Sequence, residues 1–87
     1  MKQDAVIEDL KRFIQKRFTI ADDDPEFSDS VHLFEYGYVD SFGAIEVNAF
    51  VMSRYSVKIT AADLVAYPLN SIREIAMFVS KRSQGEI

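Results

Sequence analysis

The chain contains no cysteine among its 87 residues, and it has only three glycines and two prolines. Without cysteine it cannot form disulfides, thiolate zinc sites or cysteine nucleophiles, and this composition is typical of a cytoplasmic protein. The few glycines and prolines leave little of the composition that marks a flexible linker. We therefore expect one cytoplasmic domain with a single modest core, too small for a deep enclosed active site.

Long apolar runs are absent as well. No run approaches the roughly 20 residues that a membrane span needs, and the first residues, Met1 to Asp4, lack the apolar core of a signal peptide. The net charge is −4. A negative field repels phosphate backbones, so we expect no nucleic-acid partner and favour partners with basic docking surfaces.

The acids concentrate in one stretch, which contains Asp22, Asp23, Asp24, Glu26, Asp29 and Glu35. This stretch offers oxygen ligands, but it lacks the spacing and the closing Glu of a calcium loop. We expect no metal site, and we interpret the triplet Asp22–Asp24 as part of a solvated loop.

Four segments carry helical signals. The first covers residues 4–18, with Asp4 as its N-cap and an apolar stripe made of Val6, Ile7, Leu10, Phe13, Ile14 and Phe18. The second begins at Asp40-Ser41 and runs to about residue 55. A short third helix follows the capping signal at Thr60, and a fourth opens with a capping box, Ser71 to Glu74. Its apolar stripe consists of Ile72, Ile75, Ala76 and Val79, with Met77 and Phe78 at the flanks.

The connection between the first two helices is long. We expect Val31, Leu33 and Phe34 to pack back onto the core, with a short helical turn near residues 30–36. No strand alternation is present. The sequence therefore predicts an all-α bundle of three longer helices and one short third helix, with a long first loop, over residues 1–82. Residues 83–87 should fray.

The second helix is apolar on two sides. The side expected to face the core consists of Ala44, Val47, Val51 and Tyr55, with Phe50 at its flank. The opposite side lies beside Glu46 and consists of Phe42, Ile45, Ala49 and Met52. A small domain scarcely encloses a whole helix, so we expect the second side to be exposed and to serve as a protein docking face. The alternative is that the long first loop covers it.

Ser41 stands at the start of this helix. The free N–H groups and the positive dipole end of a helix N-terminus favour an anion, such as a phosphate ester on Ser41. We expect Gly43 to leave room for an approaching partner or arm. Taken alone, Asp40-Ser41 is far more often a simple helix cap than a modification site.

The segment around this serine, residues 33–47, reads LFEYGYVDSFGAIEV. It resembles the attachment region of acyl carrier proteins and peptidyl carrier domains, in which an apolar pair and a Gly precede Asp-Ser. An apolar residue and often a Glu follow in that family. The resemblance covers nearly the whole chain, and it implies a four-helix bundle of acyl-carrier type that is not an enzyme.

The resemblance further implies that Ser41 receives phosphopantetheine from coenzyme A through a separate phosphopantetheinyl transferase. The thiol of the arm would carry an acyl or aminoacyl cargo as a thioester. Asp40 would help the transferase to recognise the site, and the family's docking positions correspond to Phe42, Ile45, Glu46, Ala49 and Met52. The further partners implied are an acyl- or aminoacyl-activating ligase and downstream biosynthetic enzymes, and we expect a monomer.

Two departures refine this interpretation. Phe42 stands where carriers of fatty-acid synthesis usually have Leu, and Met52, Ser53 and Arg54 stand where acids are common. Residues 37–43 look more like discrete carriers of secondary metabolism, or carriers of the D-alanyl type. We therefore expect a dedicated carrier of a specialised pathway.

Two other function classes fit these residues less well. Catalysis would require Ser41, the single histidine His32 and an aspartate to converge, and no nucleophile elbow is present. The stronger alternative is an unmodified helical interaction module that uses the side from Phe42 to Met52 without a covalent arm.

Overall fold

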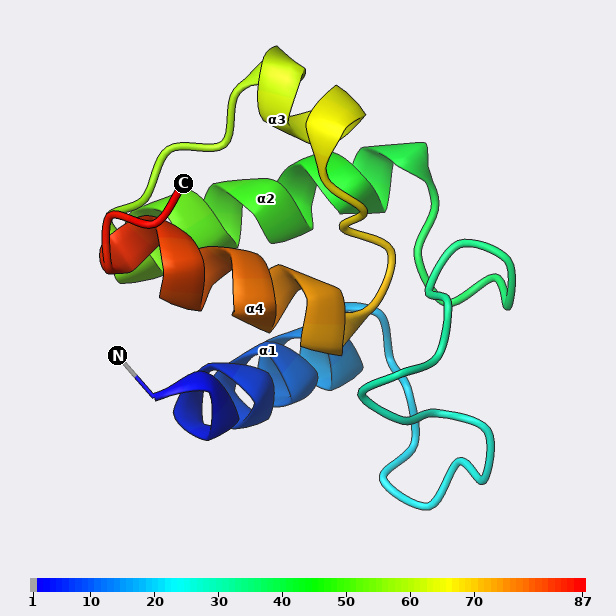
Figure 1. Ribbon diagram of the computed structural model, residues 1–87. Helices are drawn as coiled ribbons and strands as arrows, with labels where there is room; N and C mark the ends of the chain where they lie inside the picture. The colour runs from blue at the N-terminus through cyan, green and yellow to red at the C-terminus, as the bar shows by residue number, and fades with distance from the viewer. Residues whose placement is uncertain (1) are drawn as a thin grey trace.

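The computed structural model describes residues 2–87, and over this range it is all-helical. Its helices are α1 (Gln3–Arg17), α2 (Ser41–Tyr55), α3 (Ala61–Ala66) and α4 (Ile72–Ser83). Helices α1 and α4 pack closely against each other, and the long connection between α1 and α2 lies at the end of the bundle away from the C-terminus (Figure 1). The predicted fold class, with its short third helix and long first loop, is confirmed.

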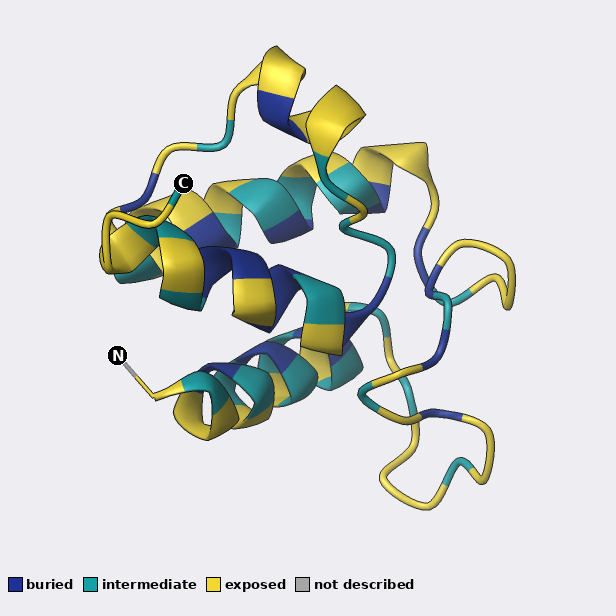
Figure 2. Cartoon of the chain, viewed as in Figure 1, coloured by how far each residue is buried: buried dark blue, intermediate teal, exposed yellow. Residues whose placement is uncertain are grey.

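The core lies between α1, α2, α4 and the first loop. The apolar stripes that the sequence predicted for α1 and α4 meet there. The fully or almost fully buried side chains include Val6, Leu10, Ile14, Ile72, Ile75, Ala76 and Val79. Figure 2 shows these buried segments along the inward sides of α1 and α4. Phe78 is also buried, whereas its neighbour Met77 is exposed. Full burial of one such side chain is worth about 1.5–3 kcal/mol, so this cluster provides most of the stability.

The ends of the helices follow their capping residues. Thr60 with Asp63, and Ser71 with Glu74, form the two capping boxes that the sequence predicted. The prediction for α1 was wrong by one residue at each end. Its N-cap is Lys2, because the Val6 N–H donates to the Lys2 carbonyl at 3.3 Å, and Asp4 lies inside the first turn. Phe18 is the C-cap rather than the last helical residue.

The first loop is anchored at Leu33, which is buried. The Leu33 N–H donates to the Asn70 carbonyl at 2.8 Å, and the Leu33 carbonyl accepts from Tyr38 and Val39 at 3.0 and 3.1 Å. Val31 is buried as predicted, but Phe34 is 36% exposed because the anchored Leu33 takes the inward position. Residues 33–37 form turns, and the Tyr36 N–H donates to the His32 carbonyl at 3.2 Å, which closes one helical turn near the expected place. Gly37 has a positive φ of 75°.

Helix α3 is held to α4 by a partly buried ion pair. The Arg82 guanidinium donates to Asp63 Oδ1 at 2.8 Å, and Asp63 Oδ2 accepts from the Thr60 N–H at 2.9 Å. These hydrogen bonds, chiefly the one from Arg82, hold the pKa of Asp63 below its ordinary value. A helix of six residues is too short to be stable alone, so these contacts fix its place.

Candidate functional site

The N-terminus of α2 uses its two polar residues differently. Asp40 is the N-cap: its carboxylate accepts from the Gly43 N–H at 2.7 Å, and its carbonyl accepts from the Ala44 N–H at 2.9 Å. Ser41 is the first helical residue and is exposed. Within residues 2–87, no hydrogen bond involves the Ser41 hydroxyl. The fold therefore leaves this hydroxyl open to solvent and to a modifying enzyme.

Ser71 shows what a capping serine looks like in the same chain. It precedes α4, is only 6% exposed, and its Oγ accepts from the Glu74 N–H at 3.1 Å. Its hydroxyl is therefore occupied by the fold. Both serines lie at the start of a predicted helix. Ser71 caps its helix, whereas Ser41 does not.

The position of Ser41 fits a phosphodiester. The first N–H groups of a helix have no partner inside the helix, and the dipole makes this end positive. In α2 the Asp40 side chain satisfies the Gly43 N–H. The N–H groups of Ser41 and Phe42 precede it at the same end, beside the oxygen that would be esterified, and they favour an anion there.

Gly43 does not have the role that the sequence suggested. It is buried, and a Cβ at this position would lie 2.7 Å from the Phe18 ring and 2.9 Å from Val39 Cγ1. The glycine lets Phe18 and the end of the first loop pack against α2. It leaves no room for an approaching partner or arm, so that expectation is corrected.

The second apolar side of α2, which we call the α2 stripe, is exposed. It consists of Phe42, Ile45, Ala49 and Met52, and Phe42 and Ile45 are 79% and 66% exposed. Val47 and Val51, on the other side of the helix, are buried. The first loop does not cover the stripe, which removes the alternative considered from the sequence. A patch of this kind on a small domain is typical of a protein interaction site.

Both charged side chains of α2 are paired with α1. Arg17 donates to Glu46 Oε1 at 2.7 Å, and Arg54 donates to Asp9 Oδ2 at 3.2 Å. The Tyr55 hydroxyl donates to the same Asp9 oxygen at 3.1 Å, and burial together with this bond raises the pKa of Tyr55 to about 12. Glu46 lies beside the stripe as predicted, but its charge is offset by Arg17. This pairing was not predictable from local patterns, because the two residues are 29 positions apart.

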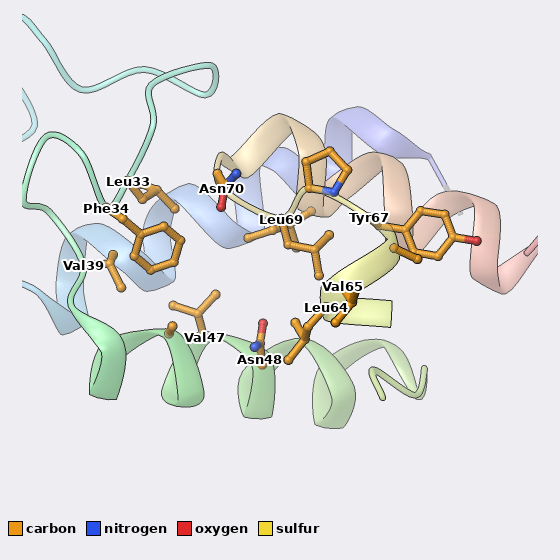
Figure 3. A pocket seen from close by; sticks show the side chains of 14 residues that line it. Leu33, Phe34, Val39, Val47, Asn48, Leu64, Val65, Tyr67, Leu69 and Asn70 are labelled. Carbon is orange, nitrogen blue, oxygen red and sulfur yellow. The ribbon is translucent and has the colours of Figure 1, made fainter. Parts of the chain in front are cut away.

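A cavity of about 470 Å³ opens beside the stripe, between α2, α3 and the first loop (Figure 3). Its walls include Val47 and Asn48 from α2, Leu64 and Val65 from α3, and Phe34 from the loop. Sequence reasoning missed this cavity. The only local signal was the pair Leu64-Val65, two large apolar residues that stay exposed on a very short helix.

The His32 side chain forms a hydrogen bond within the loop, where its Nδ1 accepts from the Glu35 N–H at 3.1 Å. Among residues 2–87, no cluster of three or more histidine, aspartate or glutamate side chains is arranged to hold a metal ion. Over the same residues, none of the helices has the length and apolar character to span a membrane.

Comparison with known proteins gives one finding. A family model described as the phosphopantetheine attachment site matches residues 8–79. No curated protein matches the chain as a relative. The matched range runs from α1 into α4, and it contains Ser41, the α2 stripe and every residue named above as a wall of the cavity.

Proposed function

Because the chain belongs to the phosphopantetheine attachment site family, and so is a carrier with phosphopantetheine held covalently on a serine, we propose that Ser41 is this serine. The main support is the capping by Asp40, which leaves the Ser41 hydroxyl exposed at the helix start. In the transfer, the Ser41 oxygen attacks the coenzyme A phosphorus nearer to pantetheine. Adenosine 3′,5′-bisphosphate leaves, and the hydroxyl proton passes to a base of the transferase.

The attached group supplies a thiol, which holds an acyl or aminoacyl cargo as a thioester. The protein supplies the anchor and the recognition surface. In this proposal Asp40 orients the site for the phosphopantetheinyl transferase, and the α2 stripe docks the transferase, the ligase that loads the cargo and the downstream enzymes. Glu46 borders this surface. The chain itself performs no catalysis, acts as a monomer and works in the cytoplasm.

The character of the stripe supports a dedicated pathway, such as one of secondary metabolism, over bulk fatty-acid synthesis. The two charged side chains of α2, Glu46 and Arg54, are both paired with α1. The stripe therefore presents apolar side chains without an unpaired acid from its own helix. A partner that binds the α2 stripe needs an apolar recess more than a strongly basic surface. The affinity of docking should therefore depend little on salt concentration.

The test is the intact mass of the protein after incubation with coenzyme A and a broad-specificity phosphopantetheinyl transferase. The wild-type chain should gain the mass of one phosphopantetheinyl group, and Ser41→Ala should gain none. Ser53→Ala is the matched control, because Ser53 is exposed later on the same helix, and it should be modified like the wild type. No gain in the wild type, or a gain that survives Ser41→Ala, contradicts the proposal.

The exposed stripe alone would also suit the unmodified interaction module considered from the sequence, but the family membership favours a carrier. The two functions differ in what Ser41→Ala does to the folded protein. A carrier loses all ability to hold cargo, whereas an interaction module still binds its partners and supports their activity. Measurement of partner activity with folded Ser41→Ala separates them.

A further inference from the structure

A groove lies on the other flank of α2, where this helix packs against α1. Its volume is about 320 Å³, and its walls consist of Asp9, Arg12, Phe13, Lys16, Phe50 and Arg54. The four wall residues from α1 follow one another at intervals of one, three or four positions, so they share one face of that helix. The groove is separate from the cavity beside α3, because the two have no wall residue in common.

The floor of this groove is apolar. The rings of Phe13 and Phe50 stack on each other, with their centroids 4.1 Å apart and their planes 11° apart. Both side chains are only partly buried, so part of each ring remains in contact with water. Because the removal of apolar surface from water is favourable, an apolar side chain of a partner would be stabilised over these rings.

The rim of the groove carries two cations that the fold leaves without a partner. Arg54 is paired with Asp9 at 3.2 Å. Arg12 and Lys16 are exposed, and neither forms an ion pair with any residue that the structure describes. Three cations therefore surround the groove against one acid, Asp9, so the groove is positive although the chain has a net charge of −4.

The shape and the charges together indicate what fits here. A groove of this kind is a common binding site for an amphipathic helix, which lays its apolar face into the groove. Arg12 and Lys16 are four positions apart, so they are neighbours on α1, with about 5–6 Å between their Cβ atoms. Two carboxylates one turn apart on a partner helix match this spacing, and an apolar residue on the same face covers the rings of Phe13 and Phe50.

We propose that the groove between α1 and α2 docks an acidic amphipathic helix of a partner protein, with Arg12 and Lys16 binding its carboxylates. Docking here needs neither the arm nor Ser41, so it is independent of the proposed function. A lipid surface fits less well, because the two phenylalanine rings form the floor of a hollow and do not project from it. Unlike docking on the α2 stripe, binding in the groove should weaken as salt screens the charges.

The probe is a synthetic, alanine-rich helical peptide with two glutamates four positions apart and a leucine on the same face. Its control peptide has glutamine in place of both glutamates. Each peptide is titrated into the unmodified, ¹⁵N-labelled protein. The glutamate peptide should shift the backbone NMR signals of residues 9–16 and 50–54, and its dissociation constant should rise with salt concentration. The glutamine peptide should bind much more weakly.

Charge reversal on α1 tests the two cations individually. Arg12→Glu and Lys16→Glu should each raise the dissociation constant of the glutamate peptide about fivefold, as expected for the loss of an exposed ion pair and its replacement by repulsion. Lys11→Glu is the matched control, because it makes the same change in net charge on the same helix but lies outside the groove. It should bind like the wild type, and circular dichroism checks that all three variants are folded.

Unmoved groove signals, an equal response to both peptides, or equal losses of affinity in all three variants overturn the proposal. Two other occupants have their own signatures. Cosedimentation with vesicles of equal parts phosphatidylcholine and phosphatidylserine, without a response to the peptide, would assign the groove to a lipid surface. Shifts of the groove signals on dilution without peptide would assign it to a second copy of the chain. Either result overturns the proposal, and neither affects the mass gain that tests Ser41.

Discussion

Asp40 and Ser41 are neighbours of similar capping ability, and the fold uses only one of them. Both residue types are good N-caps, so the sequence did not tell which one the helix employs. In the structure the Asp40 carboxylate binds the Gly43 N–H, and the Ser41 hydroxyl points to solvent without a partner among residues 2–87. A side chain that the fold does not need is one that an enzyme can modify without unfolding the helix.

This difference predicts unequal losses of stability. Asp40→Ala should lower the free energy of unfolding by about 0.5–2 kcal/mol, because it removes the cap. Ser41→Ala should change it by less than about 0.5 kcal/mol, as exposed substitutions usually do. Urea unfolding followed by circular dichroism measures both. Equal losses for the two variants would show that the serine has a structural role.

Among the helices, the start of an element was predictable where its capping residues lie next to it. The starts of α3 and α4 are set by Thr60 with Asp63 and by Ser71 with Glu74, within four-residue windows. The start of α1 was not predicted correctly, because Lys2 provides no side-chain cap. The role of Gly43 was missed for a different reason: it depends on Phe18, which belongs to another element and meets α2 only in the folded chain.

The two sides of α2 should respond oppositely to the same substitution. Met52→Glu places a charge on the exposed stripe, so it should weaken recognition by the transferase, with a rise in KM of roughly tenfold and little change in stability. Val51→Glu places the same charge at a fully buried position. It should unfold the protein, because an unpaired buried carboxylate is strongly unfavourable. Severe unfolding by Met52→Glu would mean that the stripe is part of the core.

Helix α3 should loosen in acid before the rest of the bundle. Hydrogen bonds from Arg82 and Thr60 lower the pKa of Asp63 in the folded protein relative to the unfolded chain, where an aspartate has a pKa of about 4. The ionised carboxylate therefore stabilises the fold fully above about pH 4, and this contribution is lost as the pH falls through the lowered folded-state pKa.

The measurement is the pH dependence of the backbone NMR signals of residues 61–66. In the wild type they should move toward unfolded positions below about pH 4, while the signals of α1 stay in place. Asp63→Asn should show the loosened α3 signals already at neutral pH and no acid transition of its own. A wild-type α3 that keeps its signals throughout this range would contradict the role given to the ion pair.

In the whole molecule, the core that stabilises the fold is separate from the surface that we propose for docking. The core lies between α1, α4 and the inward side of α2, whereas Ser41 and the α2 stripe lie on the outer side of α2, and the cavity opens toward α3. The sequence predicted the core from periodicity, which is a local pattern. It did not predict the cavity, whose walls come from the loop, three helices and the segment before α4, and which exists only once these have packed.

This separation predicts that the core tolerates little change. Leu10→Ala, at a position with no exposed surface, should lower the free energy of unfolding by about 2–5 kcal/mol. Leu64→Ala removes a similar side chain from the exposed short helix and should cost much less. Thermal unfolding of both variants measures the difference. A loss for Leu10→Ala as small as that for Leu64→Ala would contradict the placement of the core.

The proposed attachment point is one oxygen atom, and fragmentation mass spectrometry of the modified protein locates it directly. After conversion with coenzyme A and the transferase, the fragments should place the phosphopantetheinyl group on Ser41, the exposed first residue of α2. Attachment at any other of the chain's serines would contradict the account.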